Sequence, residues 1–176
     1  MLSGSATEAF AWIVEFTREN SDYIAPIVFA MGLGESLVFV SFFIPSTVLF
    51  LAIGAAHSAA DGSFWHVWLA ASAGAFIGDV ISFCVGRYMK GGLARVWPFY
   101  RNPEILDRAR ITFRDWGGTS IIISKFMGAI RPVLPVAAGA LEMRWGVFLP
   151  ASILSCLIWA GAFLGPGYGL QIFSWW

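Results

Sequence analysis

Four charged residues stand inside long apolar stretches of the sequence, and their types could support ion pairing, proton exchange and anion binding. They are Glu35, Asp79, Lys125 and Arg131. A charge at the centre of a bilayer costs about 2.5–3.5 kcal/mol on insertion scales, so each needs a partner or a function. Burial would let Glu35 exchange a proton. Lys125 and Arg131 could bind an anion, and the planar fork of Arg131 suits phosphate.

A purely structural interpretation of these charges stays open. Acids of the first half could neutralise bases of the second half and only hold the fold together, because buried ion pairs occur without helping stability. Asp79 is a candidate for either role. We interpret Arg87 and Arg144, which flank helix ends, as interfacial anchors or topology signals, and we assign His57 and His66 a surface role beside the outer loop.

Other site chemistry has little support in the residues. Cys84 and Cys156 fall inside apolar segments, where we interpret them as small hydrophobic side chains rather than a disulfide or metal site. We find no metal-ligand cluster, phosphate-binding loop or nucleophile motif. We therefore predict no metal, no cofactor beyond a coupled proton, no catalytic residue and no enzyme activity.

The composition places these residues in a membrane. Of the 176 residues, 58% are hydrophobic and 12% are charged, whereas soluble domains have about 45–50% and about 25%. Such a chain needs lipid around it. We predict an all-α integral membrane protein with a single membrane domain at 1–176 and without a cleavable signal peptide.

The apolar pattern predicts an ordered set of helical segments. They are an amphipathic helix at 6–21, a re-entrant segment at 24–60, a transmembrane helix at 64–86, a basic connector at 87–117 with a helix near 103–116, a second re-entrant segment at 119–141, and a transmembrane helix within 145–170 that ends near Gly165 and Pro166. Segment 24–60 is too long for one span, and Pro45 predicts a break between Ile44 and Pro45, which fits a re-entrant hairpin and leaves two short spans open as the alternative.

The uneven charge distribution predicts the orientation. Residues 87–116 hold seven basic and three acidic side chains, whereas residues 1–63 hold one basic and six acidic. The positive-inside rule therefore places the connector in the cytoplasm of a multi-pass protein. A nucleic-acid partner is not expected, because the basic residues lie between membrane segments and form no binding module.

The two halves of the chain resemble each other. Pairing Pro45 with Pro132 shifts the chain by 87 residues and also pairs Gly74 with Gly161. The first long helix would run inward and the second outward, so the halves would be inverted repeats, as in transporters with a site at the midplane. Glycines at every fourth position could pack within one chain or between two copies, so a homo-oligomer stays open.

Three stretches carry a resemblance to the DedA family of bacterial membrane proteins, which shares a domain with eukaryotic lipid scramblases. The stretches are KFMGAIRPVLPVAAGALEMRWGVF at 125–148, GAFIGDVISFCVGRYMKGG at 74–92 and GESLVFVSFFIPS at 34–46. The resemblance covers roughly 24–168. It implies an inverted repeat of two re-entrant helical hairpins, each followed by a transmembrane helix. It also implies movement of a lipid-linked phosphate, such as undecaprenyl phosphate, or of a phospholipid between leaflets of the inner membrane.

By position, the resemblance implies that Glu35 is the membrane-embedded acid and that Lys125 and Arg131 are the two essential bases. Three residues depart from the family pattern. Lys125 stands where Arg is usual, Gly128 where Pro is common, and Thr47 where many members have a second acid. Proton coupling is suggested for some members, and Thr47 removes one of its two candidate carriers.

Two further functions compete with lipid transport. A proton-coupled exchanger of small solutes or ions would use the same inverted repeat. A membrane lipid phosphatase is suggested by Lys125 to Pro132, but the spacing is one residue short and no later histidine can act as the nucleophile. We therefore predict a transporter that binds an anionic lipid head group at Lys125, Arg131 and Glu35, with Glu35 and Asp79 as candidates for proton coupling or charge pairing.

Overall fold

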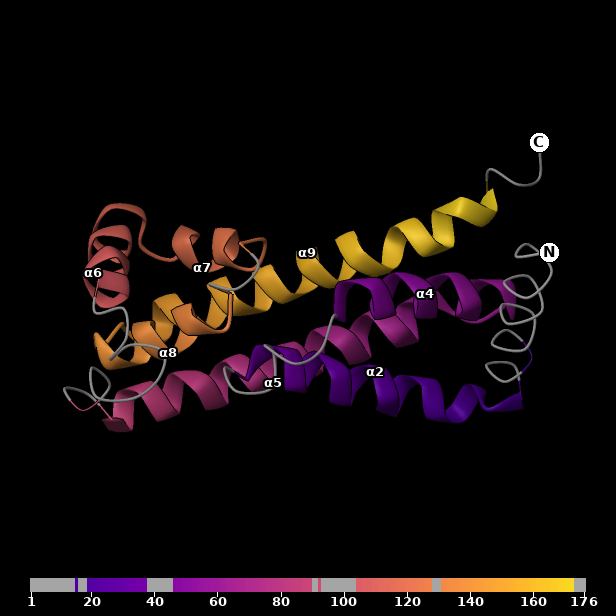
Figure 1. The fold of residues 1–176 in the computed structure, drawn as a ribbon, viewed down its shortest axis with the longest axis horizontal. Coiled ribbons are helices and arrows are strands. Elements are labelled where there is room, and N and C mark those ends of the chain that lie inside the picture. The colour runs from indigo at the N-terminus through magenta and orange to yellow at the C-terminus, as the bar shows by residue number, and fades with distance from the viewer. Residues whose placement is uncertain are drawn as a thin grey trace, which may run out of the picture.

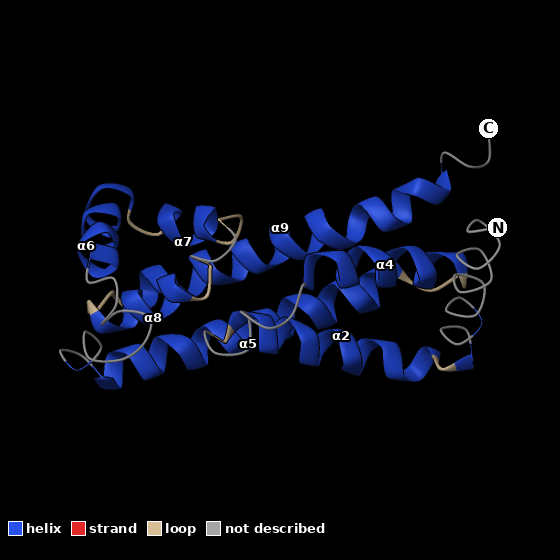
Figure 2. Ribbon diagram, in the orientation of Figure 1, coloured by secondary structure: helices blue, strands red, loops and turns tan. Residues whose placement is uncertain are grey.

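The computed structural model describes residues 15, 19–37, 46–89, 92, 104–127 and 131–172. Every regular element within these residues is a helix, as Figure 2 shows. The helices are α2 (Ser21–Ser36), α4 (Ser46–Ala59), α5 (Phe64–Met89), α6 (Glu104–Trp116), α7 (Thr119–Ser124), α8 (Val133–Ala140) and α9 (Trp145–Ile172). The protein is therefore all-helical over the described residues.

Among the described residues, two helices are long and apolar enough to cross a membrane. They are α5, over Phe64–Met89, and α9, over Trp145–Gly169. Both expose large aliphatic side chains, which would be costly in water and are favourable in lipid. These side chains include Leu69, Ile77 and Ile81 on α5 and Ile153, Leu154 and Ile158 on α9.

The shorter helices lie in two groups at opposite ends of this long pair. Figure 1 shows α2 and α4 at the end where α9 finishes, and α7 and α8 at the other end together with α6. In the first group, α2 packs on α5 and α4 packs on α9. In the second group, α8 packs on α5 and α7 packs on α9. Each long helix therefore contacts one short helix from each end.

Glycines on α5 allow the two short helices to approach it closely. A Cβ at Gly74 would overlap the carbonyl of Phe29 on α2, and a Cβ at Gly86 would overlap the carbonyl of Val136 on α8. These glycines belong to the small-residue face predicted from the sequence. Gly74 and Gly86 are thus used for packing within one chain.

Two apolar clusters enclose a polar layer between them. One cluster gathers around Phe50 and Trp159, and the other around Phe83 and Phe148. Between the clusters, α5, α9 and the neighbouring segments bury polar side chains. These include Glu35, Ser36, Asp79, Ser82, Lys125, Arg131, Ser152 and Ser155. The four predicted charges lie in this layer.

Several element boundaries differ from the prediction. Helix α9 continues through Pro166 to Ile172, so its predicted end near Gly165 and Pro166 is wrong. Membrane helices tolerate proline where neighbouring helices support the freed backbone, and Gly167 here lies against the α4 backbone at Gly54. Helix α5 extends beyond position 86 to Met89. The predicted break at Ile44 and Pro45 lies outside the described residues, as does nearly all of the predicted helix at 6–21.

Candidate functional site

Lys125 and Asp79 form the first of two buried ion pairs. Lys125 follows α7 and Asp79 lies in the middle of α5, and their side chains are only 3% and 2% exposed. The Lys125 Nζ lies 2.8 Å from each carboxylate oxygen of Asp79. It also donates to Ser36 Oγ at 3.3 Å. The ammonium group therefore has both a counter-ion and a neutral acceptor.

The Asp79 carboxylate is fully engaged as well. Its Oδ2 accepts a hydrogen bond from Ser152 Oγ at 2.8 Å and a weaker one from Cys156 Sγ at 3.5 Å. Both donors lie on α9, so this carboxylate connects the two long helices. Cys156 is a free, buried thiol, as interpreted from the sequence, and it adds this weak hydrogen bond to Asp79.

Arg131 and Glu35 form the second buried ion pair. Arg131 Nη1 donates to Glu35 Oε1, and the two side chains are 7% and 6% exposed. The guanidinium lies over the ring of Trp159, with Cζ 4.0 Å from the ring centroid. Trp159 is itself held by an edge contact with Phe50 at 5.0 Å between centroids. The Arg131 guanidinium is therefore held on one face by the Trp159 ring and at Nη1 by the hydrogen bond to Glu35.

The second pair keeps polar atoms without partners. Among the described residues, Arg131 Nε, Arg131 Nη2 and Glu35 Oε2 are buried and have no hydrogen-bond partner. A buried polar atom left unpaired costs about 1–3 kcal/mol, and more when it is charged. Nε and Nη2 together form the donor edge that binds phosphate or carboxylate in a bidentate manner. This pair can therefore receive an anionic group without breaking an existing bond at that edge.

The end of α2 is held so that both acids face the same layer. Ser82 Oγ of α5 donates to the carbonyl of Ser36 at 2.9 Å. A Cβ at Gly78 would overlap Leu33 and Ser36, so the glycine lets α2 end directly against α5. Ser36 then reaches Lys125, while its neighbour Glu35 reaches Arg131. The two ion pairs are thereby neighbours.

All four residues singled out from the sequence thus lie in one buried layer. Both acids come from the first half of the chain and both bases from the second. Sequence reasoning missed Ser36, Ser152 and Trp159. Ser152, Cys156 and Trp159 recur at helical spacing on α9, but that helix is apolar throughout and offers no polar face that would have drawn attention to them.

Outside this layer, one prediction fails and another is refined. His57 is buried, with 6% exposure, and its ring lies 6.3 Å from that of Tyr168, so its predicted surface role is wrong. His66 is exposed, as predicted. Arg87 donates to the carbonyl of Met143 at 3.1 Å and lies over the Phe83 ring. It therefore joins the end of α5 to the turn before α9, whereas Arg144 is exposed.

The chain is similar in sequence to known membrane proteins. The VTT domain matches residues 44–169. The chain is 33% identical over 158 residues to the inner membrane protein YabI of Escherichia coli, covering 89% of this chain and 62% of YabI. It is 27% identical to the uncharacterized membrane protein BU139 of Buchnera aphidicola, covering 89% and 61%. It is 32% identical to the uncharacterized membrane protein slr0232 of Synechocystis, covering 75% and 65%.

These similarities define the class and the compartment. The chain belongs to the VTT-domain family, that is, the DedA family of membrane proteins. It is a multi-pass protein of the bacterial inner membrane. It spans less than two thirds of the length of these relatives. No solved structure matches it.

Proposed function

We propose that this protein moves an anionic lipid, either a polyprenyl phosphate such as undecaprenyl phosphate or a phospholipid, between the leaflets of the inner membrane. The observation that carries the proposal is the Nε and Nη2 edge of Arg131, which has no hydrogen-bond partner among the described residues. A buried guanidinium that keeps two nitrogen groups free is costly unless a ligand completes its hydrogen bonds. In a membrane protein, an intramembrane charge of this kind favours a substrate pathway.

A phosphate monoester or diester suits this donor edge best. Its oxygens accept two parallel N–H bonds from one guanidinium. Trp159 holds the guanidinium plane, and Phe50 holds Trp159. The Lys125 ammonium lies nearby, but Asp79 and Ser36 already occupy it. We therefore assign the head-group contact to Arg131 and a structural role to Lys125, in place of the substrate-binding role that the sequence predicts for it.

We further propose that the two halves are inverted repeats of re-entrant hairpins. The packing supports this in a specific way. If α2, α4 and α5 correspond to α7, α8 and α9, then the α2–α5 contact corresponds to α7–α9, and the α4–α9 contact corresponds to α8–α5. Gly167 of α9 lies against the α4 backbone at Gly54, just as Gly86 of α5 lies against the α8 backbone at Val136. Gly86 and Gly167 are 81 residues apart, so the long helices would align at an offset of 81, not 87.

Glu35 is the proposed proton carrier in this scheme. One of its oxygens binds Arg131 and the other has no partner among the described residues. A phosphate at the Nε and Nη2 edge of Arg131 would place a second anion beside Glu35, which is bonded at Nη1. Protonation of Glu35 would then remove the repulsion between two buried negative charges that share one guanidinium. The side chain of Thr47 lies outside the described residues.

The experiment compares variants reconstituted in liposomes. Leaflet exchange of a fluorescent polyprenyl phosphate and of a fluorescent phospholipid is measured with and without a pH gradient. We expect Arg131→Gln combined with Glu35→Gln to remove both charges while keeping polar side chains at both positions, and to slow exchange by about 30-fold or more. Wild-type exchange rates in that well-folded double variant would refute the proposal.

The pH gradient tests the proton role separately. We expect the wild-type rate to depend on the gradient and the Glu35→Gln variant to lose that dependence. A gradient-independent wild-type rate would remove Glu35 from the proposed role while leaving anion binding intact. Uptake of a small anion without lipid exchange would instead favour the exchanger. Release of inorganic phosphate from the lipid would favour the phosphatase.

A further inference from the structure

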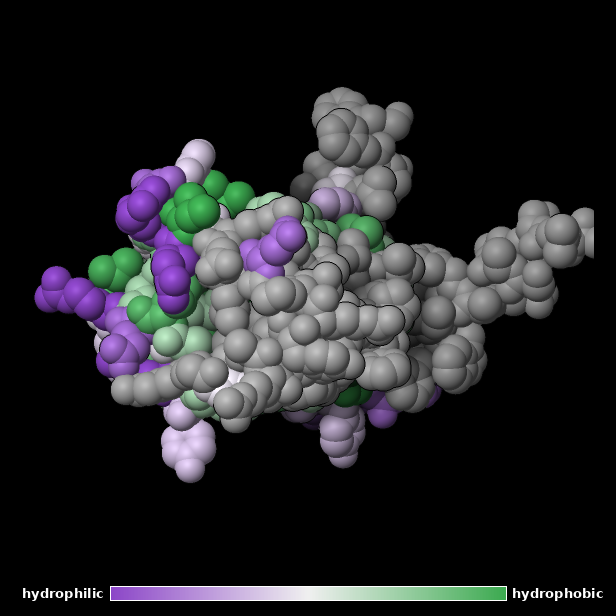
Figure 3. Space-filling view, turned by 60° about the vertical axis from the view of Figure 1, so that its left-hand side comes forward, coloured by the Kyte–Doolittle hydropathy of each residue, from purple (hydrophilic) through white to green (hydrophobic). Residues whose placement is uncertain are grey.

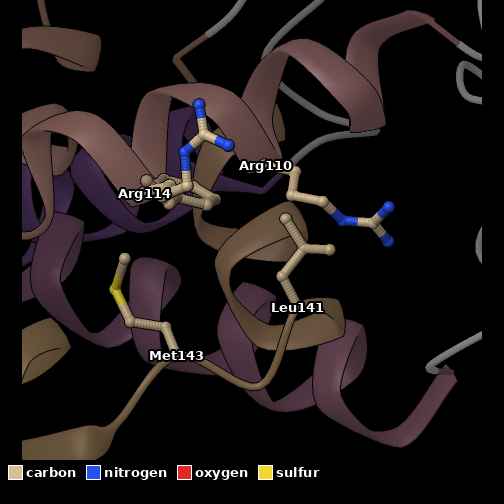
Figure 4. Close-up of a pocket in the computed structure, with 5 residues that line it drawn as sticks. Arg110, Arg114, Leu141 and Met143 are labelled. Carbon is tan, nitrogen blue, oxygen red and sulfur yellow. The ribbon is translucent and has the colours of Figure 1, made fainter.

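A pocket lies apart from the buried charges, at the end of the molecule where α6 meets the turn between α8 and α9. Its volume is about 260 Å³, and its lining consists of Arg110, Phe113, Arg114, Leu141 and Met143. Figure 4 shows Leu141 and Met143 directed toward the helix that carries Arg110 and Arg114, whose guanidinium ends extend outward. The pocket therefore combines an apolar floor with two positive charges at its rim.

The lining chemistry selects an amphiphilic anion. Phe113, Leu141 and Met143 supply only apolar surface, while both polar members are permanently positive. Glu142 lies between two lining residues in the sequence but does not line the pocket. Arg114 Nε is paired with Asp115 at 3.0 Å. That pair is exposed, so it holds the guanidinium only weakly.

The surroundings place this pocket at a membrane surface. Helix α6 exposes Ile111 and Trp116, at 53% and 59%, next to its arginines, which is the pattern of a helix lying in the interface. Figure 3 turns this end toward the viewer and shows strongly hydrophilic residues mixed with hydrophobic ones on it. The same end holds Arg87 at the end of α5, so the positive-inside rule places it at the cytoplasmic leaflet.

The walls of the pocket are fixed to the transmembrane part of the protein. Arg87 donates to the carbonyl of Met143 at 3.1 Å and so anchors the turn that carries Leu141 and Met143 to α5. Leu141 itself follows α8, which packs on α5 through Gly86 and Gly139. A ligand between α6 and this turn would therefore bridge a surface helix and the membrane-embedded helices.

We propose that this pocket binds an anionic phospholipid of the cytoplasmic leaflet, with its phosphate at Arg110 and Arg114 and the start of an acyl chain against Phe113, Leu141 and Met143. Its size suits a head group and part of one chain rather than a whole ligand of drug size, for which pockets reach about 300–1,000 Å³. The bound lipid fixes α6 against the turn between α8 and α9. This site is separate from Arg131 and does not depend on the translocation activity.

The test uses the full-length protein in detergent, titrated with phosphatidylglycerol or with phosphatidylcholine, with bound lipid counted by native mass spectrometry. We expect phosphatidylglycerol to bind and raise the melting temperature, and phosphatidylcholine to do so far less. Arg110→Gln and Arg114→Gln should each weaken phosphatidylglycerol binding about 5-fold, and together about 30-fold. Arg144→Gln is the matched control, because it removes one exposed charge near the same turn without touching the pocket.

The possible outcomes separate this site from its rivals. An equal loss in Arg144→Gln would show diffuse surface attraction and overturn the proposal. Full competition by glycerol phosphate would show a site for free phosphate, and equal binding of phosphatidylcholine would show an apolar groove without head-group selection. Either result would overturn the proposal too. Because Arg110 is exposed, its variant should keep the lipid-free melting temperature, and the Glu35→Gln/Arg131→Gln variant should still bind phosphatidylglycerol here.

Discussion

The two buried ion pairs lie side by side in one polar layer, yet they differ in how completely their hydrogen bonds are satisfied. In the Lys125–Asp79 pair, Ser36, Ser152 and Cys156 supply the remaining partners. In the Arg131–Glu35 pair, two guanidinium nitrogens and one carboxylate oxygen are left over within the described residues. Counting the described residues alone, the hydrogen bonds of the first pair are complete without a ligand, and those of the second pair are not.

This difference suggests a division of labour between the pairs. A buried charge that is fully hydrogen-bonded mainly fixes geometry, and removing its partner is costly. A buried charge with unused donors keeps capacity for a ligand. The structure thus favours the structural role for Asp79, which sequence alone left open, and concentrates the proposed binding role on Arg131 and Glu35. The predictions below test whether the two pairs can be separated by mutation.

The largest expected effect comes from breaking the complete pair. Asp79→Leu would leave the Lys125 ammonium buried without a counter-ion and would free the Ser152 hydroxyl. We expect a loss of about 3–5 kcal/mol in the free energy of unfolding, measured by denaturant titration in detergent micelles.

The matched control removes both charges of that pair. Asp79→Leu combined with Lys125→Met should recover most of the lost stability, because a buried pair is often replaceable by apolar side chains of similar volume. If the pair is structural, this double variant should also keep lipid exchange in liposomes. A stable double variant without exchange would place Lys125 in the binding machinery and would end the proposed division.

Exchanging the type of base is the next sharpest test. Arg131→Lys keeps the charge but removes the planar fork, so we expect about tenfold slower lipid exchange at unchanged protein amount. Lys125→Arg should change the exchange rate much less, since the ammonium there only completes a pair with Asp79 and Ser36. Equal effects at the two positions would contradict the distinction between them.

The sequence was informative about which charges are buried together, and less so about which neighbouring side chains complete their hydrogen bonds. Four ionisable residues in apolar segments are conspicuous because each is expensive in lipid, and the structure places all four in one layer. Ser152 and Trp159 gave no comparable signal, since a serine and a tryptophan are both ordinary in a membrane helix. The buried position of His57 also depends on the packing of α4 against α9, which local sequence does not specify.

Trp159 offers a smaller test of the incomplete pair. As a positioning residue, it should act through Arg131, so Trp159→Phe, which keeps an aromatic face of lower cation affinity, should slow exchange about three- to fivefold. If Trp159 acts through Arg131, the Trp159→Phe variant should need a higher lipid concentration than the wild type to reach half of its maximal exchange rate. In the Arg131→Gln/Glu35→Gln background the same substitution should add no further loss of exchange, whereas a merely structural tryptophan would add its own.

The smallest expected effect lies at the complete pair. Cys156→Ala removes a weak thiol donor from Asp79 Oδ2 but leaves the Ser152 bond of 2.8 Å to the same oxygen. Because that oxygen stays satisfied, we expect a change of about 0.5 kcal/mol in the free energy of unfolding and no change in lipid exchange. A loss of lipid exchange in Cys156→Ala, with stability retained, would mean that the Lys125–Asp79 pair also takes part in transport. The proposed contrast between a structural pair and a ligand-binding pair would then be wrong.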